Sequence, residues 1–172
     1  MVETIESRLW LSTANEYLNA VQVLIDHESS RNFENPNTFP IFVLLAYTFE
    51  HIFKVERQIV VGGFDKGHDL EVLWKESKSS LASVVDEAKS KFVERAISEF
   101  SVEYRNVAHS IGPNHGQPSR CFEDNLGLLS KLTAKPFQSR YPKVAIREEV
   151  ETRFLLCVAR HFHRVLESRV AA

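Results

Sequence analysis

The sequence predicts an all-α protein, an up-and-down bundle of five or six helices in a single domain that spans residues 1–172. Apolar residues recur along most of the chain at the spacing that keeps them on one face of a helix. Stretches rich in proline, glycine, serine and asparagine separate these periodic segments. No long segment alternates apolar and polar residues as a half-buried strand does, so the sequence favours helices alone.

The first expected helix begins after Thr4, whose hydroxyl is expected to cap it, and ends near residues 27–30. Its predicted inner stripe consists of Ile5, Leu9, Tyr17, Leu18, Val21, Leu24 and Ile25. Residues 29–40 are dense in serine, asparagine and proline, which indicates a loop. A second helix is expected from about Pro40, because proline is tolerated in a first helical turn.

The second helix is apolar around most of its circumference, which predicts that it is the most buried element. Its expected core residues are Phe49, Phe53, Leu44 and Leu45. The sequence GGFDKGHDL should end this helix, and Asp69 should cap a short helix that follows.

Three further helices are expected towards the C-terminus. A long one should begin at about Ser80 and end at Gly112-Pro113, since glycine and proline commonly stop a helix. The next should cover residues 126–132, although Gly127 in its interior weakens it. The segment KPFQSRYPK breaks the chain again, and the last helix is expected from about Ile146 to Val170.

Composition and charge exclude several classes of protein. The formal net charge of −2 gives no global basic field, so any contact with nucleic acid needs a local patch. The two cysteines, Cys121 and Cys157, form no CxxC pair, and neither a metal nor another cofactor is expected. No apolar run is long enough to cross a bilayer, and the N-terminus lacks an apolar signal segment. We therefore expect a cytoplasmic protein without a membrane partner.

Three short patterns follow one another along the expected bundle: FEHIFKVE at 49–56, GHDLEVL at 67–73 and SRYP at 139–142. Their order and setting resemble HEPN domains, which are helical modules. In that family a glutamate and a lysine lie one turn apart on the second helix, Gly-His-Asp-Leu opens the third, and Arg-Tyr-Pro often follows late. The resemblance covers about residues 13–170 and implies a homodimer. In the sequence alone, Glu50 and Lys54 are interpreted as a surface pair beside a buried face.

The resemblance also implies a candidate ribonuclease site at Arg105, Asn106 and His109. Many catalytic HEPN ribonucleases carry an arginine, commonly followed by asparagine, and a histidine after four to six residues, whereas three stand between Arg105 and His109. Arginine would hold the phosphate and histidine would move a proton, with a second histidine supplied by the two-fold partner. The alternative is a helix end, where cations are stabilised by the helix dipole by about 0.3–1 kcal/mol. The shortened spacing favours the helix end.

Two other groups of residues have candidate binding roles. Arg140, Tyr141 and Lys143 combine positive charge with an aromatic ring, as a nucleic-acid contact requires, although a mixed-charge solvated face is the favoured alternative. Cys157 and His161 lie one turn apart on the last helix, but zinc needs three or four ligands, so no metal site is expected there.

Three functions remain open from the sequence. The first is a dimeric HEPN-like module that acts as a nucleic-acid-linked or partner-binding accessory protein, in a toxin–antitoxin or defence setting. The second is a metal-independent endoribonuclease that uses Arg105 and His109 from two protomers, and so has RNA as its partner. The third is a small-molecule or nucleotide-binding helper of a nucleotidyltransferase.

Overall fold

The computed structural model describes residues 5–29, 38–63, 67–99, 118–133 and 151–171. These residues form helices and no strand, which confirms the predicted all-α class. The helices are α1 (Ile5–Ser29), α2 (Thr38–Val61), α3 (Leu70–Glu99), α5 (Pro118–Thr133) and α7 (Thr152–Ala171). Within these ranges, no helix combines the length and the hydropathy that a membrane span requires.

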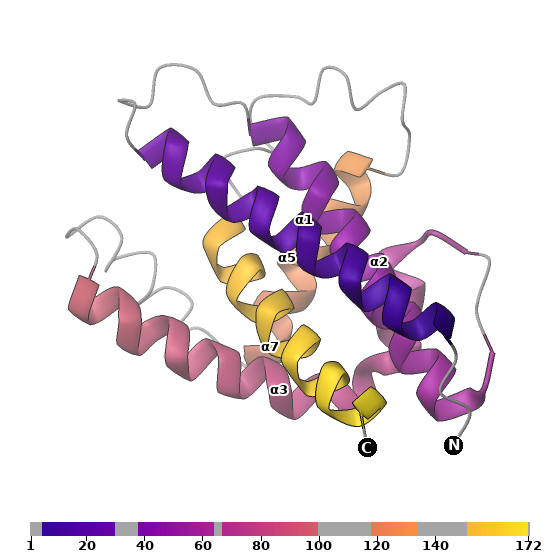
Figure 1. The fold of residues 1–172 in the computed structure, drawn as a ribbon. Helices are drawn as coiled ribbons and strands as arrows, with labels where there is room; N and C mark the ends of the chain where they lie inside the picture. The colour runs from indigo at the N-terminus through magenta and orange to yellow at the C-terminus, as the bar shows by residue number, and fades with distance from the viewer. Residues whose placement is uncertain (1–4, 30–37, 64–66, 100–117, 134–150, 172) are drawn as a thin grey trace.

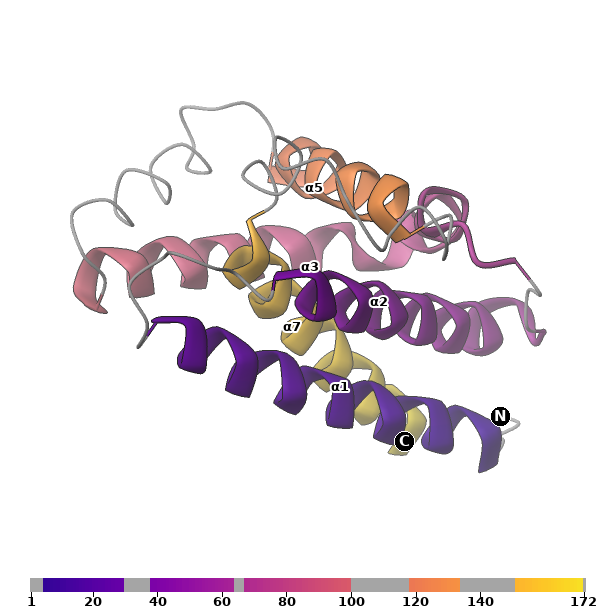
Figure 2. The same ribbon diagram turned by 90° about the horizontal axis from the view of Figure 1, so that it is seen from above.

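The helices pack into one bundle in which α2 and α7 each contact all the other described helices. α1 and α2 lie side by side and run in opposite directions (Figures 1 and 2). α7 packs against this pair with its last residues near the first residues of α1, and α3 lies on the other side of α7. α5 packs on α3 and α2. This arrangement leaves one face of α7 between α1 and α3.

Aromatic rings from four helices fill the centre of the bundle. Phe49 and Phe53 of α2, Trp74 of α3, Phe122 of α5 and Phe162 of α7 contact one another, with ring centroids 4.9–6.3 Å apart. Such pairs contribute about 0.5–1.5 kcal/mol each beyond the burial of their area. The prediction that Phe49, Phe53 and Leu45 are core residues is confirmed, whereas Leu44 is only partly buried.

The inner face of α1 differs from the predicted one at its N-terminal end. The buried hydrophobic residues of α1 are Leu11, Ala14, Leu18, Val21 and Ile25. Ile5 and Leu9, which were expected in the stripe, are 89% and 63% exposed. A helix turns by about 100° per residue, so both point away from the face that Leu11 and Leu18 define. The first turns of α1 therefore expose apolar side chains.

The junction between α2 and α3 follows the predicted stop and start signals. Gly62 adopts a φ of 78°, and its N–H donates to the carbonyl of Gln58 at 3.0 Å, which closes α2. The Asp69 carboxylate accepts hydrogen bonds from the backbone N–H groups of Glu71 at 2.9 Å and Val72 at 3.3 Å. Asp69 is therefore the N-cap of α3, as predicted.

The prediction of two helices after Asp69 is wrong, because α3 runs unbroken from Leu70 to Glu99. No glycine or proline interrupts this segment, and the Ser80 hydroxyl donates back to the carbonyl of Ser77 at 2.9 Å within the helix. In α5, a Cβ at Gly127 would lie 2.7 Å from Oε1 of Glu71, but this is the end of an exposed side chain that can move aside, so the contact does not require glycine.

Candidate anion-binding site

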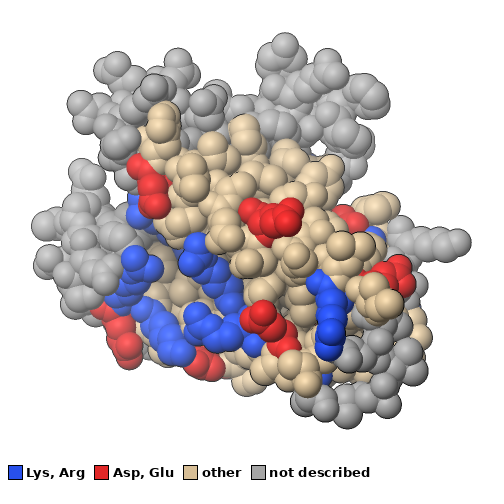
Figure 3. Space-filling model, viewed as in Figure 1, with Lys and Arg blue, Asp and Glu red and all other residues tan. Residues whose placement is uncertain are grey.

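A pocket of about 270 Å³ lies between α1, α3 and α7. Its lining residues are Gln22, Ile25 and Asp26 of α1, Lys91, Phe92 and Arg95 of α3, and Arg153, Leu156, Cys157, Arg160, His161 and Arg164 of α7. Lys and Arg side chains gather on this face around a hollow between α1 and α3 (Figure 3). Five permanent cations and one carboxylate line the pocket, in a chain whose formal net charge is −2. The pocket is therefore a local basic patch in a chain that has no global basic field.

The helical repeat explains why α7 contributes most of the lining. Arg153, Cys157, Arg160, His161 and Arg164 follow one another at intervals of three, four or one residues, which places all of them on one face of α7. The opposite faces of α7 bury Phe154, Val158 and Phe162 in the core, so the polar stripe is turned outward. Packing of the core therefore fixes where these cations point.

The cations of the pocket differ in how they are paired. Nζ of Lys91 contacts Oε1 of Glu87 one turn earlier on α3, and this hydrogen bond is the main cause that lowers the pKa of Glu87. Arg160 and Arg164 form neither a hydrogen bond nor an ion pair with any described residue. Two like charges one helical turn apart repel each other. An anion placed between them relieves this repulsion.

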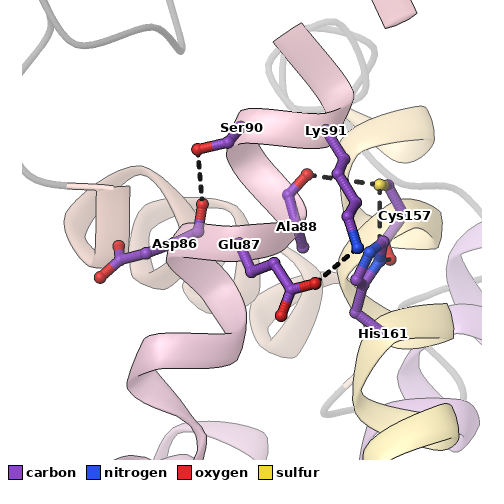
Figure 4. A network of polar contacts seen from close by, with 7 residues as sticks. All are labelled: Asp86, Glu87, Ala88, Ser90, Lys91, Cys157 and His161. Atoms are coloured by element: carbon purple, nitrogen blue, oxygen red, sulfur yellow. Dashed lines mark hydrogen bonds and ion pairs between the residues drawn. The ribbon is translucent and has the colours of Figure 1, made fainter. Parts of the chain in front are cut away.

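Cys157 and His161 form the polar floor of the pocket (Figure 4). The Cys157 thiol donates to the carbonyl of Ala88 on α3, with 3.5 Å between Sγ and O. Burial raises the pKa of this thiol, while Arg95, Lys91, Arg160 and Arg164 oppose the shift through their charges. Because burial is the larger effect, the thiol stays protonated near neutral pH and is not an activated nucleophile.

His161 is held in one tautomer by its own helix. Its Nδ1 lies 2.9 Å from the carbonyl oxygen of Cys157, and a carbonyl can only accept, so Nδ1 carries the proton. Nε2 is buried and has no hydrogen-bond partner in the part of the chain that the structure describes. In the neutral ring, Nε2 is therefore an acceptor without a donor. His163, by contrast, places Nε2 2.9 Å from the carbonyl of Leu11 and faces α1.

A second polar cluster joins α2 to the start of α3, and it corrects the interpretation of Glu50 and Lys54 as a surface pair. Oε1 of Glu50 accepts hydrogen bonds from Nζ of Lys54 at 2.7 Å and Nδ1 of His68 at 2.8 Å. Glu50 is 8% and Lys54 only 3% exposed, because the Trp10 ring of α1 covers the ammonium group at 5.2 Å from its centroid. Each charge has a partner, so the cluster links α2 to α1 and to the start of α3 and does not form a binding site.

The residues proposed from the sequence as sites lie outside the described ranges. They are Arg105, Asn106 and His109, proposed for catalysis, and Arg140, Tyr141 and Lys143, proposed for nucleic-acid binding. Among the residues that are described, no three His, Cys, Asp or Glu side chains converge as a metal site would need. The pocket was not predicted from the sequence, although the spacing of the polar residues on one face of α7 was a signal for that part of its lining.

Comparison of the chain with protein-family models, with curated proteins and with solved structures found no match. The resemblance to HEPN domains therefore stays a prediction from the sequence. The structure adds that two of the patterns behind this resemblance, residues 49–56 and 67–73, meet at the hydrogen bond between Glu50 and His68.

Proposed function

We propose that this protein is a dimeric HEPN-like helical module that binds RNA through the pocket between α1, α3 and α7, as an accessory protein in a toxin–antitoxin or defence setting. The observation that carries the proposal is the convergence of five Lys and Arg side chains from two helices on one pocket. Two of them, Arg160 and Arg164, are exposed and form no hydrogen bond or ion pair with the described residues. A phosphate group can form such bonds with both guanidinium groups.

The lining favours contacts to phosphates over contacts to bases. Phe92 is the phenyl ring of the pocket, but it is 3% exposed and packs edge-on against Phe154 with 5.6 Å between centroids. A buried ring offers no platform on which a base could stack. Guanidinium and ammonium groups bind phosphate without reading the sequence, so we expect binding with little sequence preference and strong salt dependence.

Fluorescence anisotropy with a labelled single-stranded RNA tests the proposal in the full chain. Replacing Arg160 and Arg164 together by alanine should weaken binding at least tenfold and reduce the slope of log K against log salt by about one to two. The matched control is Lys75→Ala, because Lys75 is an exposed lysine of α3 about 24 Å along the helix from Lys91. Equal losses in both variants, or no binding by the wild type at low salt, would refute the proposal.

The homodimer is the second part of the proposal. Light scattering should give about twice the chain mass of 19.7 kDa at micromolar concentration. A mass of one chain would refute it and would also remove the second histidine that in-line cleavage of RNA needs.

A metal-independent endoribonuclease that uses Arg105 and His109 is the alternative proposal. It requires RNA cleavage in EDTA that disappears in His109→Ala. The shortened spacing between Arg105 and His109 favours binding of RNA without cleavage above a buffer blank. That result would refute the ribonuclease and leave the accessory role as the proposed function.

A further inference from the structure

The pocket has a floor and a rim with different chemistry. At the rim stand the guanidinium groups of Arg160 and Arg164, which are exposed and have no partner among the described residues. At the floor, Nε2 of His161 is buried and also lacks a partner, although the His161 side chain as a whole is 9% exposed. The two arginines and the His161 ring, whose Nε2 lacks a donor among the described residues, therefore line the same pocket.

The fixed tautomer of His161 decides what the floor can accept. Because Nδ1 donates to the Cys157 carbonyl, the neutral ring offers only a lone pair at Nε2. A ligand satisfies this nitrogen either by donating an O–H to it or by accepting an N–H after the ring has gained a proton. In both descriptions one proton lies between Nε2 and a ligand oxygen.

A phosphomonoester brings such a proton, whereas a phosphodiester does not. The second proton of a phosphomonoester titrates near a pKa of about 6, so it is available for sharing near neutral pH. A diester inside a nucleic-acid strand has no ionisable proton left near neutral pH. It also has one negative charge in place of the monoester's nearly two, and so matches the charges of Arg160 and Arg164 less well.

The size of the pocket points to the same group. Pockets for drug-sized ligands have volumes of about 300–1,000 Å³, and this pocket has about 270 Å³. It therefore holds a phosphate and the sugar next to it better than several nucleotides.

Access to the floor requires a local movement, because the amino end of Lys91 lies beside the His161 ring and both interact with Glu87 (Figure 4). The side chains of Lys91 and Glu87 are 49% and 56% exposed, so their ion pair can open at little cost.

We propose that the pocket binds a phosphomonoester, with Arg160 and Arg164 on its outer oxygens and Nε2 of His161 sharing its proton. The inference deepens the proposed function, since it names the part of an RNA that the pocket takes. The same chemistry has two sources, the terminal phosphate of a strand and a free mononucleotide.

The first experiment compares ligands on the wild-type protein. Anisotropy is measured with one RNA oligonucleotide in three forms: with a 5′-phosphate, with a 3′-phosphate and with hydroxyl groups at both ends. Calorimetry is measured with AMP and with the methyl diester of AMP. At least one phosphorylated end should bind about tenfold more tightly than the hydroxyl form, and AMP about tenfold more tightly than its methyl diester.

The second experiment uses variants to assign the roles. Arg160→Ala and Arg164→Ala should each weaken AMP binding about tenfold, whereas Lys75→Ala, outside the pocket, should not change it. His161→Phe keeps a planar aromatic ring, slightly larger than imidazole, without its nitrogens, and it should abolish the preference of the protein for AMP over the diester. If His161→Phe fails to fold, the preference of the wild type for monoester over diester decides alone.

The outcomes separate this inference from the proposed function. RNA binding that depends on Arg160 and Arg164 but ignores the terminal phosphate would overturn the inference and leave the proposed function standing. Binding of AMP without binding of any RNA would support the phosphomonoester pocket, identify a free nucleotide as its source, and refute the RNA-binding function. Equal binding of AMP and its diester would overturn the inference whatever RNA does.

Discussion

An ion pair between a glutamate and the lysine four residues later forms in two of the described regions of this protein, with opposite surroundings. In the pair of Glu50 and Lys54, the side chains are 11% and 4% exposed, and the two atoms that form the bond are 2.7 Å apart. In the pair of Glu87 and Lys91, beside the pocket, the side chains are 56% and 49% exposed. One sequence pattern thus produces a buried ion pair in α2 and a solvated one in α3.

The difference shows which charges hold the fold and which are free to act on a ligand. A buried charge that loses its partner remains without water or a counterion, so the pair on α2 is fixed for as long as the bundle is folded. A solvated pair loses little when it opens, because water replaces each partner. The charges around Lys91, and the two arginines that have no ion pair with the described residues, therefore suit reversible binding, whereas the charges around Lys54 suit structure.

The largest expected effect comes from breaking the buried pair. Lys54→Met keeps much of the apolar volume of the side chain but leaves Glu50 without its ammonium partner, and it should lower the free energy of unfolding by about 3 kcal/mol. Denaturant titration measures this loss. The matched control Lys91→Met removes the lysine of the solvated pair. It should leave the denaturant midpoint of unfolding unchanged. Equal losses in the two variants would show that burial does not distinguish the pairs.

A smaller effect is expected from the second partner of Glu50. His68 donates to the same oxygen as Lys54, but its side chain is 78% exposed. His68→Ala should therefore lower the free energy of unfolding by only about 0.2–1 kcal/mol. A loss as large as that of Lys54→Met would mean that the link between α2 and the start of α3 depends on the histidine.

The arginines of the pocket should contribute nothing favourable to the stability of the unliganded protein. Replacing Arg160 and Arg164 together by alanine removes a like-charge pair one turn apart, so the free energy of unfolding should rise by up to about 0.5 kcal/mol. Thermal melts in low salt, where repulsion is least screened, are the most sensitive measurement. A clear loss of stability would assign these two residues to the fold instead of to a ligand.

The smallest effect is a dependence of stability on pH near the buried cluster. Burial lowers the pKa of His51 from the usual 6.5, although a hydrogen bond to the Tyr47 carbonyl opposes the shift. The unfolded chain therefore binds this proton more readily, so the contribution of His51 to the free energy of unfolding is constant well above pH 6.5 and falls as the pH drops through that value. His51→Gln should flatten this part of the pH profile. An unchanged slope between pH 7.5 and 5.5 would contradict the assignment.

The sequence predicted most helices because their signals are local. The apolar α2, the Gly62 stop and the Asp69 cap each depend on residues within one or two turns, and all three are found in the structure. The burial of Lys54 was not predictable, since the ring that covers it belongs to Trp10, on another helix. For the pocket, the polar stripe of α7 could be predicted from its spacing, but the residues of α1 and α3 that complete the lining could not, because only the packing of α7 brings the three segments together.

The two tryptophans of the chain stand in environments so different that they act as separate optical probes. Trp74 is 3% exposed among the central rings, and its indole N–H donates to Glu123 at 2.9 Å. Trp10 lies instead against His51, with 4.6 Å between ring centroids, and beneath the ammonium group of Lys54. Emission from Trp10 alone should thus change when α1 loosens from α2, whereas emission from both changes only when the whole bundle melts. Fluorescence of variants that keep only one tryptophan would therefore show which half of the molecule opens first.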